Sequence, residues 1–294
     1  MNVLHDIAED LLAALRHKVD GKAESLSYQV VSGGSINAVY KLTVEQKQLC
    51  CKINSVSDFP GMFSLEADGL ALLRSSGAIR VPEVIVNTVI KSSQVLVLEW
   101  LEPQKKTPGF WKTFGEQLSQ LHCVKGTRFG LDYDNYMGAL KQTNKRSALW
   151  TDFFFEQRIQ PQVRLASDNG LLSASQCSLF ERLPTLLPQL FPQAAPVLLH
   201  GDLWSGNFIC TDRQQPALID PAVYYGHSAV DLALTTLFGG FDKSFYEAYH
   251  YYNPLPADHD RQWDCCNLYP LLIHLNLFGR SYLPQIISII KGLQ

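Results

Sequence analysis

The cysteine content does not support a disulfide-stabilised or zinc-ribbon protein. The 294 residues include seven cysteines, an odd number, and two pairs of them are adjacent, at 50–51 and 265–266. Adjacent cysteines make a poor disulfide framework, and no C-x-x-C spacing of the kind used in zinc ribbons occurs. Reduced cysteines in a cytoplasmic protein are the favoured interpretation.

Long apolar runs and basic clusters are also missing. No stretch of about 18 uninterrupted apolar residues occurs, which predicts no membrane span. Asp6, Glu9 and Asp10 lie where a secretory signal would need an apolar core. The net charge is −3, and the most basic stretch, residues 141–146, is short, so we expect no nucleic-acid partner.

The N-terminal third predicts a β-rich block. Residues 3–15 carry apolar side chains at helical spacing, and 63–77 predict a second helix that Gly77 would end. Alternating, β-branched runs predict strands at 26–33, 37–44, 47–54, 82–89 and 93–101.

The rest of the chain is mainly helical in pattern. Helices are expected at 109–124, 148–166 and 174–187 and again from about residue 227, and short strands at 196–200, 207–211 and 216–220. The pattern changes near residues 99–109. This predicts an α+β chain of two lobes, a β-rich N-lobe of residues 1–101 and a mainly helical C-lobe of residues 102–294.

Residues 198–208, LLHGDLWSGNF, place polar side chains directly after a predicted strand. His200, Asp202 and Asn207 fit the pattern H-x-D-x-x-x-x-N. A phosphotransferase needs a carboxylate to accept the proton of the substrate hydroxyl and a nearby amide oxygen for Mg²⁺, roles that suit Asp202 and Asn207. Asp220, at the end of a later strand, is the candidate second metal ligand. The alternative is a hairpin in which Asp202 caps a turn and Asn207 satisfies backbone groups.

Two upstream segments are candidates for nucleotide binding. SGGSIN at 32–37 lies between two predicted strands, where glycines let backbone N–H groups approach phosphate oxygens, although a glycine hairpin is the commoner explanation. LEWLEP at 98–103 resembles a hinge whose backbone could bind an adenine edge, or else a plain linker. The candidate contacts are Gly33, Gly34, Ser35 and Asn37 in the first segment and Glu99, Trp100 and Leu101 in the second.

Lys52 and Glu66 form a candidate ion pair. Lys52 alternates with apolar neighbours on its predicted strand, as a side chain that points into a cleft would, although this pattern taken alone favours a solvent-facing lysine. A buried ammonium needs a partner to stay charged. Glu66, on the helix that follows, is the natural one.

In this order the motifs resemble the protein-kinase-like fold, in the small-molecule branch that contains aminoglycoside and choline phosphotransferases. HGDLWSGN at 200–207, IDPAVYYGH at 219–227 and WTDFFFEQRIQPQ at 150–162 are similar to the fructosamine kinase, or ketosamine-3-kinase, family. The resemblance runs from Gly33 to the C-terminal helices.

The resemblance implies ATP-dependent phosphorylation of a sugar hydroxyl on a ketosamine, either a small glycated amine or a glycated lysine of a protein. By this analogy Lys52 contacts the α- and β-phosphates and Glu66 holds Lys52. Asn207 and Asp220 hold Mg²⁺, and Asp202 orients the attacking hydroxyl.

Three neighbours of these residues have expected supporting roles. Trp204 is either a wall of the sugar site or a core aromatic that anchors the loop. Asp231 is expected to brace the catalytic loop from the following helix. His200 is expected to bond to backbone near Asp220 rather than to carry protons.

The sequence departs from the family pattern at two places. Ser228 and Ala229 stand where members often carry Arg and Glu, which puts substrate preference or a local salt bridge in doubt. Ser35 stands where many members carry a cysteine, so we expect no redox switch in that loop.

Two other functions stay open at this point. One is a kinase for another small alcohol, such as an aminoglycoside or choline. The other is a non-catalytic ATP-binding module, which would usually have lost Lys52, Asp202 or Asp220, all of which are present. The motifs do not separate fructosamines from ribulosamines.

Overall fold

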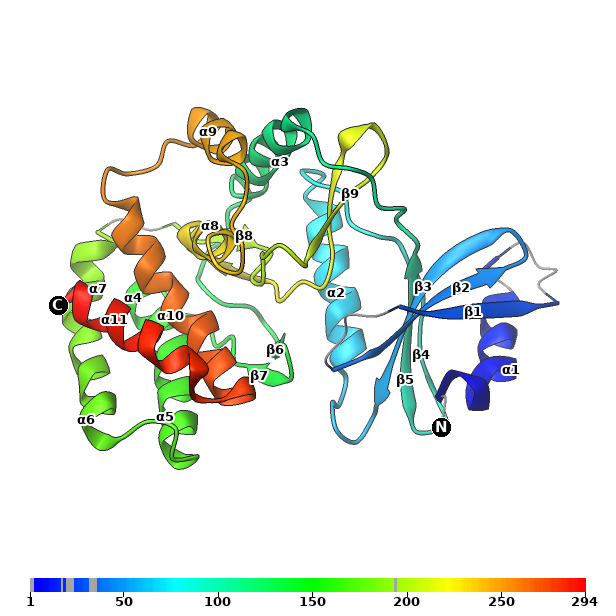
Figure 1. Cartoon of the computed structure of the whole chain (residues 1–294), viewed down its shortest axis with the longest axis horizontal. Coiled ribbons are helices and arrows are strands. Elements are labelled where there is room, and N and C mark those ends of the chain that lie inside the picture. The colour runs from blue at the N-terminus through cyan, green and yellow to red at the C-terminus, as the bar shows by residue number, and fades with distance from the viewer. Residues whose placement is uncertain (1–2, 17, 20–23, 32–35, 193–194) are drawn as a thin grey trace.

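The computed structural model describes residues 3–16, 18–19, 24–31, 36–192 and 195–294. A five-stranded antiparallel sheet with two helices lies on one side, and a mainly helical part on the other (Figure 1). This arrangement confirms the predicted α+β class. Within those ranges, no helix is long and apolar enough to cross a membrane.

The sheet has the strand order β1-β2-β3-β5-β4, and each neighbouring pair is antiparallel. All five strands occur where the alternating pattern predicts them, although β5 ends two residues early. Their bounds are β1 Leu26–Val31, β2 Ala38–Val44, β3 Lys47–Ser55, β4 Val84–Ile90 and β5 Ser93–Glu99.

The alternation along β3 determines which side chains reach the helical part. Cys51 and Ile53 belong to the buried cluster beneath helix α1 (Val3–Arg16), on the outer face of the sheet. Side chains of a strand point alternately to opposite faces. Lys52 therefore points to the inner face, toward helix α2 (Met62–Ser75), which lies between the sheet and the helical part (Figure 1).

The helical part contains the remaining helices of the described residues. The longest is α10 (His259–Phe278), which is buried along most of its length. The others are α3 (Pro108–Leu121), α4 (Trp150–Phe153), α5 (Gln160–Asp168), α6 (Ala174–Cys177), α7 (Leu183–Leu190), α8 (Ala229–Thr235), α9 (Lys243–Tyr252) and α11 (Leu283–Leu293).

Three short antiparallel strand pairs lie outside the five-stranded sheet. β8 (Val197–Leu199) pairs with β11 (Tyr224–Gly226), β9 (Phe208–Cys210) with β10 (Pro216–Leu218), and β6 (Asn135–Met137) with β7 (Leu140–Gln142). The sequence predicts β8, β9 and β10, but β10 ends before Asp220. It misses β6, β7 and β11, since three residues are too few to show a period of two.

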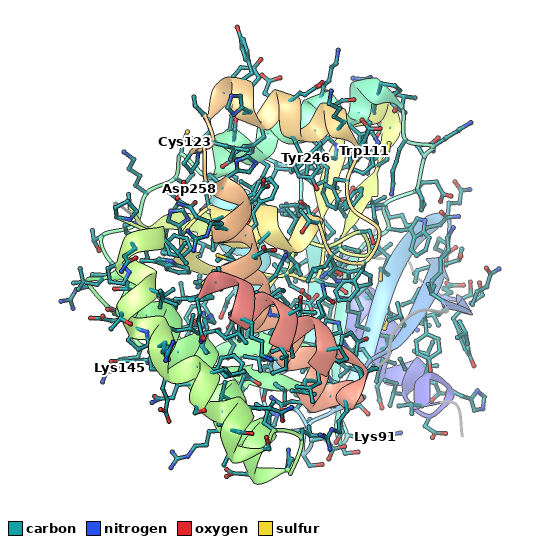
Figure 2. The ribbon with its side chains drawn as sticks, turned by 60° about the vertical axis from the view of Figure 1, so that its left-hand side comes forward. Lys91, Trp111, Cys123, Lys145, Tyr246 and Asp258 are labelled. Atoms are coloured by element: carbon teal, nitrogen blue, oxygen red, sulfur yellow. The ribbon has the colours of Figure 1, made fainter. Side chains whose placement is uncertain are left out.

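An aromatic cluster joins α3 and α9 to β9. Phe114 lies 5.3 Å from Phe245 and 5.0 Å from Phe208, measured between ring centroids. Trp111 and Tyr246 belong to the same region (Figure 2). Phe208 directly follows Asn207, so the cluster anchors the end of the loop that contains the H-x-D-x-x-x-x-N pattern.

The predicted helix 148–166 contains a wider turn. A π-helical segment, Phe154–Ile159, separates α4 from α5, and Pro161 lies at the start of α5. Proline has no N–H for the regular helical bond, which helps to explain the irregularity.

Arg158, inside this π-helical turn, is fully buried. Its guanidinium donates to the carbonyl of Thr143 and, at 2.6 Å, to Asn144 Oδ1. It also lies 4.1 Å from the ring centroid of Tyr224 and 4.6 Å from that of Phe153. Carbonyl oxygens and aromatic rings thus stabilise this cation, a combination that suits the flat, multi-donor guanidinium.

We expect Arg158→Lys to destabilise the protein almost as much as Arg158→Met, by about 3 kcal/mol, because a compact ammonium lacks the planar fork that reaches both acceptors while its face lies on the rings. Chemical denaturation of the variants checks this. Arg164→Met, at an exposed arginine of the same helical region, is the control and should change stability by less than about 0.5 kcal/mol. A lysine variant as stable as the wild type would contradict the role assigned to the guanidinium.

Candidate active site

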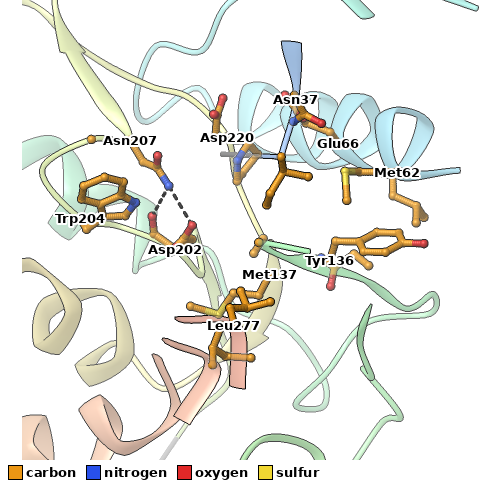
Figure 3. Close-up of a pocket in the computed structure, with 18 of the residues that line it drawn as sticks. Asn37, Met62, Glu66, Tyr136, Met137, Asp202, Trp204, Asn207, Asp220 and Leu277 are labelled. Atoms are coloured by element: carbon orange, nitrogen blue, oxygen red, sulfur yellow. Dashed lines mark hydrogen bonds between the residues drawn. The ribbon is translucent and has the colours of Figure 1, made fainter. Parts of the chain in front are cut away.

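A cavity of about 480 Å³ opens between the sheet, α2 and the helical part (Figure 3). Its lining comes from segments that are far apart in the sequence. Seven predicted site residues contribute to it: Asn37, Lys52, Glu66, Asp202, Trp204, Asn207 and Asp220. The other predicted contacts of the glycine-rich stretch, Gly33, Gly34 and Ser35, lie outside the described residues.

The predicted hinge residues do not line this cavity. The Glu99 carboxylate accepts a hydrogen bond from Arg80 at 2.5 Å, and Trp100 Nε1 donates to Glu102 at 2.7 Å. Leu101 is buried. These side chains are therefore engaged elsewhere, and adenine binding through the backbone of residues 99–101 stays a prediction.

His200 joins the loop after β8 to the segment after β10. Its Nε2 lies 2.8 Å from the carbonyl of Ile219, and its Nδ1 accepts from the backbone N–H of Asp202 at 3.2 Å. The proton therefore resides on Nε2, and burial lowers the pKa of His200, which keeps the ring neutral. The predicted bond to the backbone near Asp220 is present. Because Nε2 contacts Ile219 and Nδ1 contacts Asp202, both ring nitrogens of His200 have a partner.

Asp231, in the first turn of α8, holds the backbone of the same loop. Its two carboxylate oxygens accept from the N–H groups of His200 and Gly201, each at 2.8 Å, and His122 Nε2 lies 3.3 Å away. Burial alone would raise the pKa of Asp231, but the hydrogen bonds from His122 and Gly201 outweigh it and the pKa is lowered. A buried carboxylate with three donors is the bracing group that the sequence predicts.

Gly201 allows the loop to pass close to the segment after Asp220. Its φ of +84° lies in the left-handed region, and a Cβ there would be 2.1 Å from the carbonyl oxygen of Ala222. The neighbouring backbone bond, from Ala222 N–H to the His200 carbonyl, measures 2.9 Å. A side chain at position 201 would force Asp202 and Asp220 apart.

Asp202 and Asn207 are hydrogen-bonded partners within this loop (Figure 3). Asn207 Nδ2 donates to the Asp202 carbonyl at 2.8 Å and to its carboxylate at 2.9 Å. Burial raises the pKa of Asp202 to about 7; the bond from Asn207 opposes this shift, and the charges of Asp220 and Asp231 add to it. A carboxylate with such a pKa is able to accept a proton near neutral pH.

Lys52 is bound by two carboxylates. Its Nζ donates to Glu66 at 2.6 Å and to Asp220, and the lysine is only 4% exposed. Burial would lower the pKa of Lys52, but the charges of Asp220 and Glu66 outweigh it, so the pKa is raised and the ammonium stays charged. The same burial raises the pKa of Glu66, against the attraction of Lys52.

Asp220 itself has an unusual backbone. Its φ of +54° is uncommon for a residue with a side chain and marks local strain. The residues after it are fixed by buried amides: Asn135 donates to the carbonyl of Val223 at 2.9 Å, and Gln142 to that of Ala222 at 3.1 Å. These bonds from β6 and β7 determine where the Asp220 carboxylate enters the cavity.

Several lining residues have no counterpart in the sequence prediction. They come from the start of α2, from β6 with its turn, and from the end of α10, and they include Met62, Tyr136, Met137, Ile273, His274, Leu277 and Phe278. Apolar residues at helical spacing look the same whether they face a core or a cavity, so the sequence holds no signal for them.

Two of the positions that depart from the family pattern, Ser228 and Ala229, lie away from the cavity. Ser228 directly precedes α8, and Ala229 is buried at 3% exposure. Neither lines the cavity. Their placement gives no support to an effect on substrate preference.

We expect Gly201→Ala to lower the free energy of unfolding by about 2 kcal/mol more than Gly170→Ala. Both glycines have positive φ, but a Cβ at position 170 meets nothing within 4 Å. The control therefore shares the backbone strain and lacks the clash with Ala222. Denaturant unfolding of both variants checks this, and equal losses would show that the close approach is not a constraint.

Comparison with known proteins gives matches along almost the whole chain. A family model described as fructosamine kinase matches residues 8–294. A probable ketoamine kinase from Synechocystis sp. is 37% identical over 89% of this chain and 88% of its own length.

Solved structures show the same relationship. A putative fructosamine-3-kinase from Haemophilus somnus superposes with a TM-score of 0.87 at 27% identity and covers 96% of each chain. An aminoglycoside phosphotransferase in ternary complex with ADP and hygromycin B has a TM-score of 0.63 at 13% identity over 96% of this chain and 98% of its own, which shows a shared kinase-like fold. The chain thus belongs to the fructosamine kinase family and is a phosphotransferase with an alcohol group as acceptor.

Proposed function

We propose that the protein transfers the γ-phosphoryl group of Mg-ATP to a sugar hydroxyl of a ketosamine. The acceptor is a fructosamine or a ribulosamine, either free or formed on a protein lysine. The observation that carries this proposal is the convergence of Lys52, Glu66, Asp202, Asn207 and Asp220 on one cavity. The family membership supports the acceptor class, and the ADP bound to the aminoglycoside phosphotransferase of similar fold agrees with an adenine nucleotide.

Asn207 and Asp220 are the residues proposed to hold Mg²⁺. Both offer oxygen ligands, which this ion prefers, and Mg²⁺ commonly takes only one or two protein ligands beside phosphates and water. Because Asn207 Nδ2 is bound to Asp202, the amide Oδ1 is the atom left for a cation. When bound, the ion neutralises charge on the phosphates.

Lys52 is the proposed contact for the α- and β-phosphates. Glu66 would keep the ammonium in place when phosphate oxygens replace Asp220 as its second partner. The backbone of residues 33–37 and of residues 99–101 remains the proposed cradle for the rest of the nucleotide.

Asp202 is the proposed acceptor of the hydroxyl proton. In the transfer, the sugar oxygen bonds to the γ-phosphorus, the bond from that phosphorus to the β–γ bridging oxygen breaks, and the hydroxyl proton passes to the Asp202 carboxylate. The raised pKa of Asp202 favours this last step. Most of the rate enhancement would come from positioning and charge neutralisation.

Trp204 is proposed as a wall of the sugar site. It lines the cavity and is 36% exposed, which supports this role over that of a core anchor. Its ring covers Gly206, where a Cβ would lie 2.4 Å from ring atoms. The ring thus packs on the loop at Gly206 while it stays partly exposed.

We expect Asp202→Asn to lower kcat on a ketosamine by about 10²-fold or more, because the amide cannot accept the proton. The KM for ATP should change little, since Asp202 is not placed on the nucleotide. Coupled ADP release, measured with fructose-lysine and ribulose-lysine, checks this. An unchanged kcat in a folded variant would remove Asp202 from the reaction.

The same assay with choline and kanamycin tests the neighbouring activities. If choline or kanamycin is the only acceptor that is phosphorylated, the transfer mechanism stands and the acceptor is not a ketosamine. Binding of ATP with no turnover on any of the four acceptors would favour a non-catalytic module.

We expect Glu66→Gln to raise the KM for ATP about tenfold, equivalent to about 1.4 kcal/mol, with a smaller fall in kcat than Asp202→Asn. The neutral amide would hold the Lys52 ammonium less firmly. Glu247→Gln, at an exposed glutamate of α9, is the matched control and should leave the KM unchanged. A KM for ATP that is unaffected in Glu66→Gln would contradict the assigned role of the ion pair.

A further inference from the structure

A continuous row of rings leads away from the catalytic loop. Trp204 packs edge-on against Phe238, with ring centroids 6.1 Å apart, and Phe238 lies 4.8 Å from His274. His274 lies 5.4 Å from Phe278. Trp204, His274 and Phe278 all line the cavity. We call these four residues the aromatic patch.

The aromatic patch is open to solvent rather than packed away. Trp204 is 36% exposed, Phe238 40% and Phe278 54%. Single exposed apolar side chains are common, but adjoining ones beside a cavity are typical of a binding surface.

The backbone at Phe238 is strained in a way that keeps its ring in this row. Its φ is +54°, an unfavourable region for an aromatic residue, and Gly239 and Gly240 after it also have positive φ. Ser205, on the catalytic loop, donates to the Phe238 carbonyl at 3.3 Å. Such strain tends to persist where the surrounding structure holds it, commonly at functional sites.

The cavity has a charged end and an uncharged end. Among the described lining residues, the charged side chains are Lys52, Glu66, Asp202 and Asp220, and each already has a role in phosphoryl transfer. Met137 and Leu277 lie on the other side of Asp202 from Asp220 (Figure 3). His274 is half-buried, and burial lowers its pKa, outweighing the hydrogen bond from Nδ1 to the Pro270 carbonyl at 2.7 Å, which raises it, so the ring stays neutral at neutral pH.

We propose that the aromatic patch binds the substituent on the ketosamine nitrogen, and that this substituent is an uncharged alkyl or aryl group. The inference rests on the proposed function, in which the sugar hydroxyl lies at Asp202. The remainder of the acceptor then extends along Trp204 toward Phe278. A carboxylate on that remainder would lose hydration without gaining a partner, and an ammonium would exchange its hydration for ring faces alone, whereas a hydrocarbon chain would bury apolar surface on the rings.

Three matched acceptors test this proposal on the wild-type protein. They are the ketosamines of hexylamine, 6-aminohexanoate and 1,6-diaminohexane, which share one six-carbon chain and differ only in the charge at its far end. Each is prepared with fructose and with ribulose, and fructose-lysine and ribulose-lysine are run beside them. We expect the hexylamine adduct to have a KM at least about tenfold below that of both charged adducts.

Charge substitutions at Phe278 test the location. Phe278 is 54% exposed, so either charge can be placed there without burying it. We expect Phe278→Asp to lower the KM for the diamine adduct and raise it for the carboxylate adduct, and Phe278→Lys to do the reverse. Tyr251→Asp and Tyr251→Lys are the controls, at an aromatic of α9 that is 79% exposed and does not line the cavity, and should change neither KM.

The outcomes separate the two proposals. A wild-type protein that uses the charged adducts as well as the neutral one overturns the apolar substituent, while the ketosamine kinase stands. If the Phe278 variants shift the KM for both charged adducts in the same direction, or shift neither KM, the placement of the substituent on the aromatic patch is overturned. Absence of turnover on every ketosamine, lysine adducts included, overturns the proposed function and this inference with it.

Discussion

The contact on which the cavity depends is the buried ammonium of Lys52 between two carboxylates. Lys52 comes from the sheet, Glu66 from α2 and Asp220 from the segment after β10 in the helical part. An ammonium that is 4% exposed loses most of its hydration, so it requires both partners to stay charged. The same pairing that satisfies Lys52 therefore holds the sheet against the helical part across the cavity.

The loop that carries Asp202 is fixed by its backbone rather than by its reactive side chains. Asp231 accepts the N–H groups at 200 and 201, and His200 accepts that of 202 while it holds the carbonyl of Ile219. Within the part of the chain that the structure describes, these bonds leave the Asp202 carboxylate with one side-chain donor, Asn207. The loop is thus rigid where it meets α8 and the segment before Asp220, and open where a substrate would enter.

Local sequence patterns predicted those features that depend on residues close together in the chain. The alternation of β3 placed Lys52 toward the cleft, and the spacing of His200, Asp202 and Asn207 identified the loop. Features set by distant contacts were not visible. The π-helical turn around Arg158 depends on Thr143, Asn144 and Tyr224, and β6 is stabilised by the carbonyl that Asn135 reaches at Val223. The side chain of Glu99 in the predicted hinge turns to Arg80, and adenine binding by the hinge backbone stays a prediction.

The two ends of the cavity are encoded by different parts of the sequence. The charged end is built mainly from one stretch, 200–220, with Lys52 and Glu66 opposite it. The apolar end is built from β6, from the turn at Phe238 and from the last turns of α10, and it meets the charged end at Trp204. Substitutions at Phe238, Leu277 or Phe278 can alter the surface offered to an acceptor without touching any hydrogen bond that positions Asp202 or Lys52. In the proposed mechanism, phosphoryl transfer and acceptor selection therefore occupy separable parts of one cavity, which is why motifs that predict the reaction leave the acceptor open.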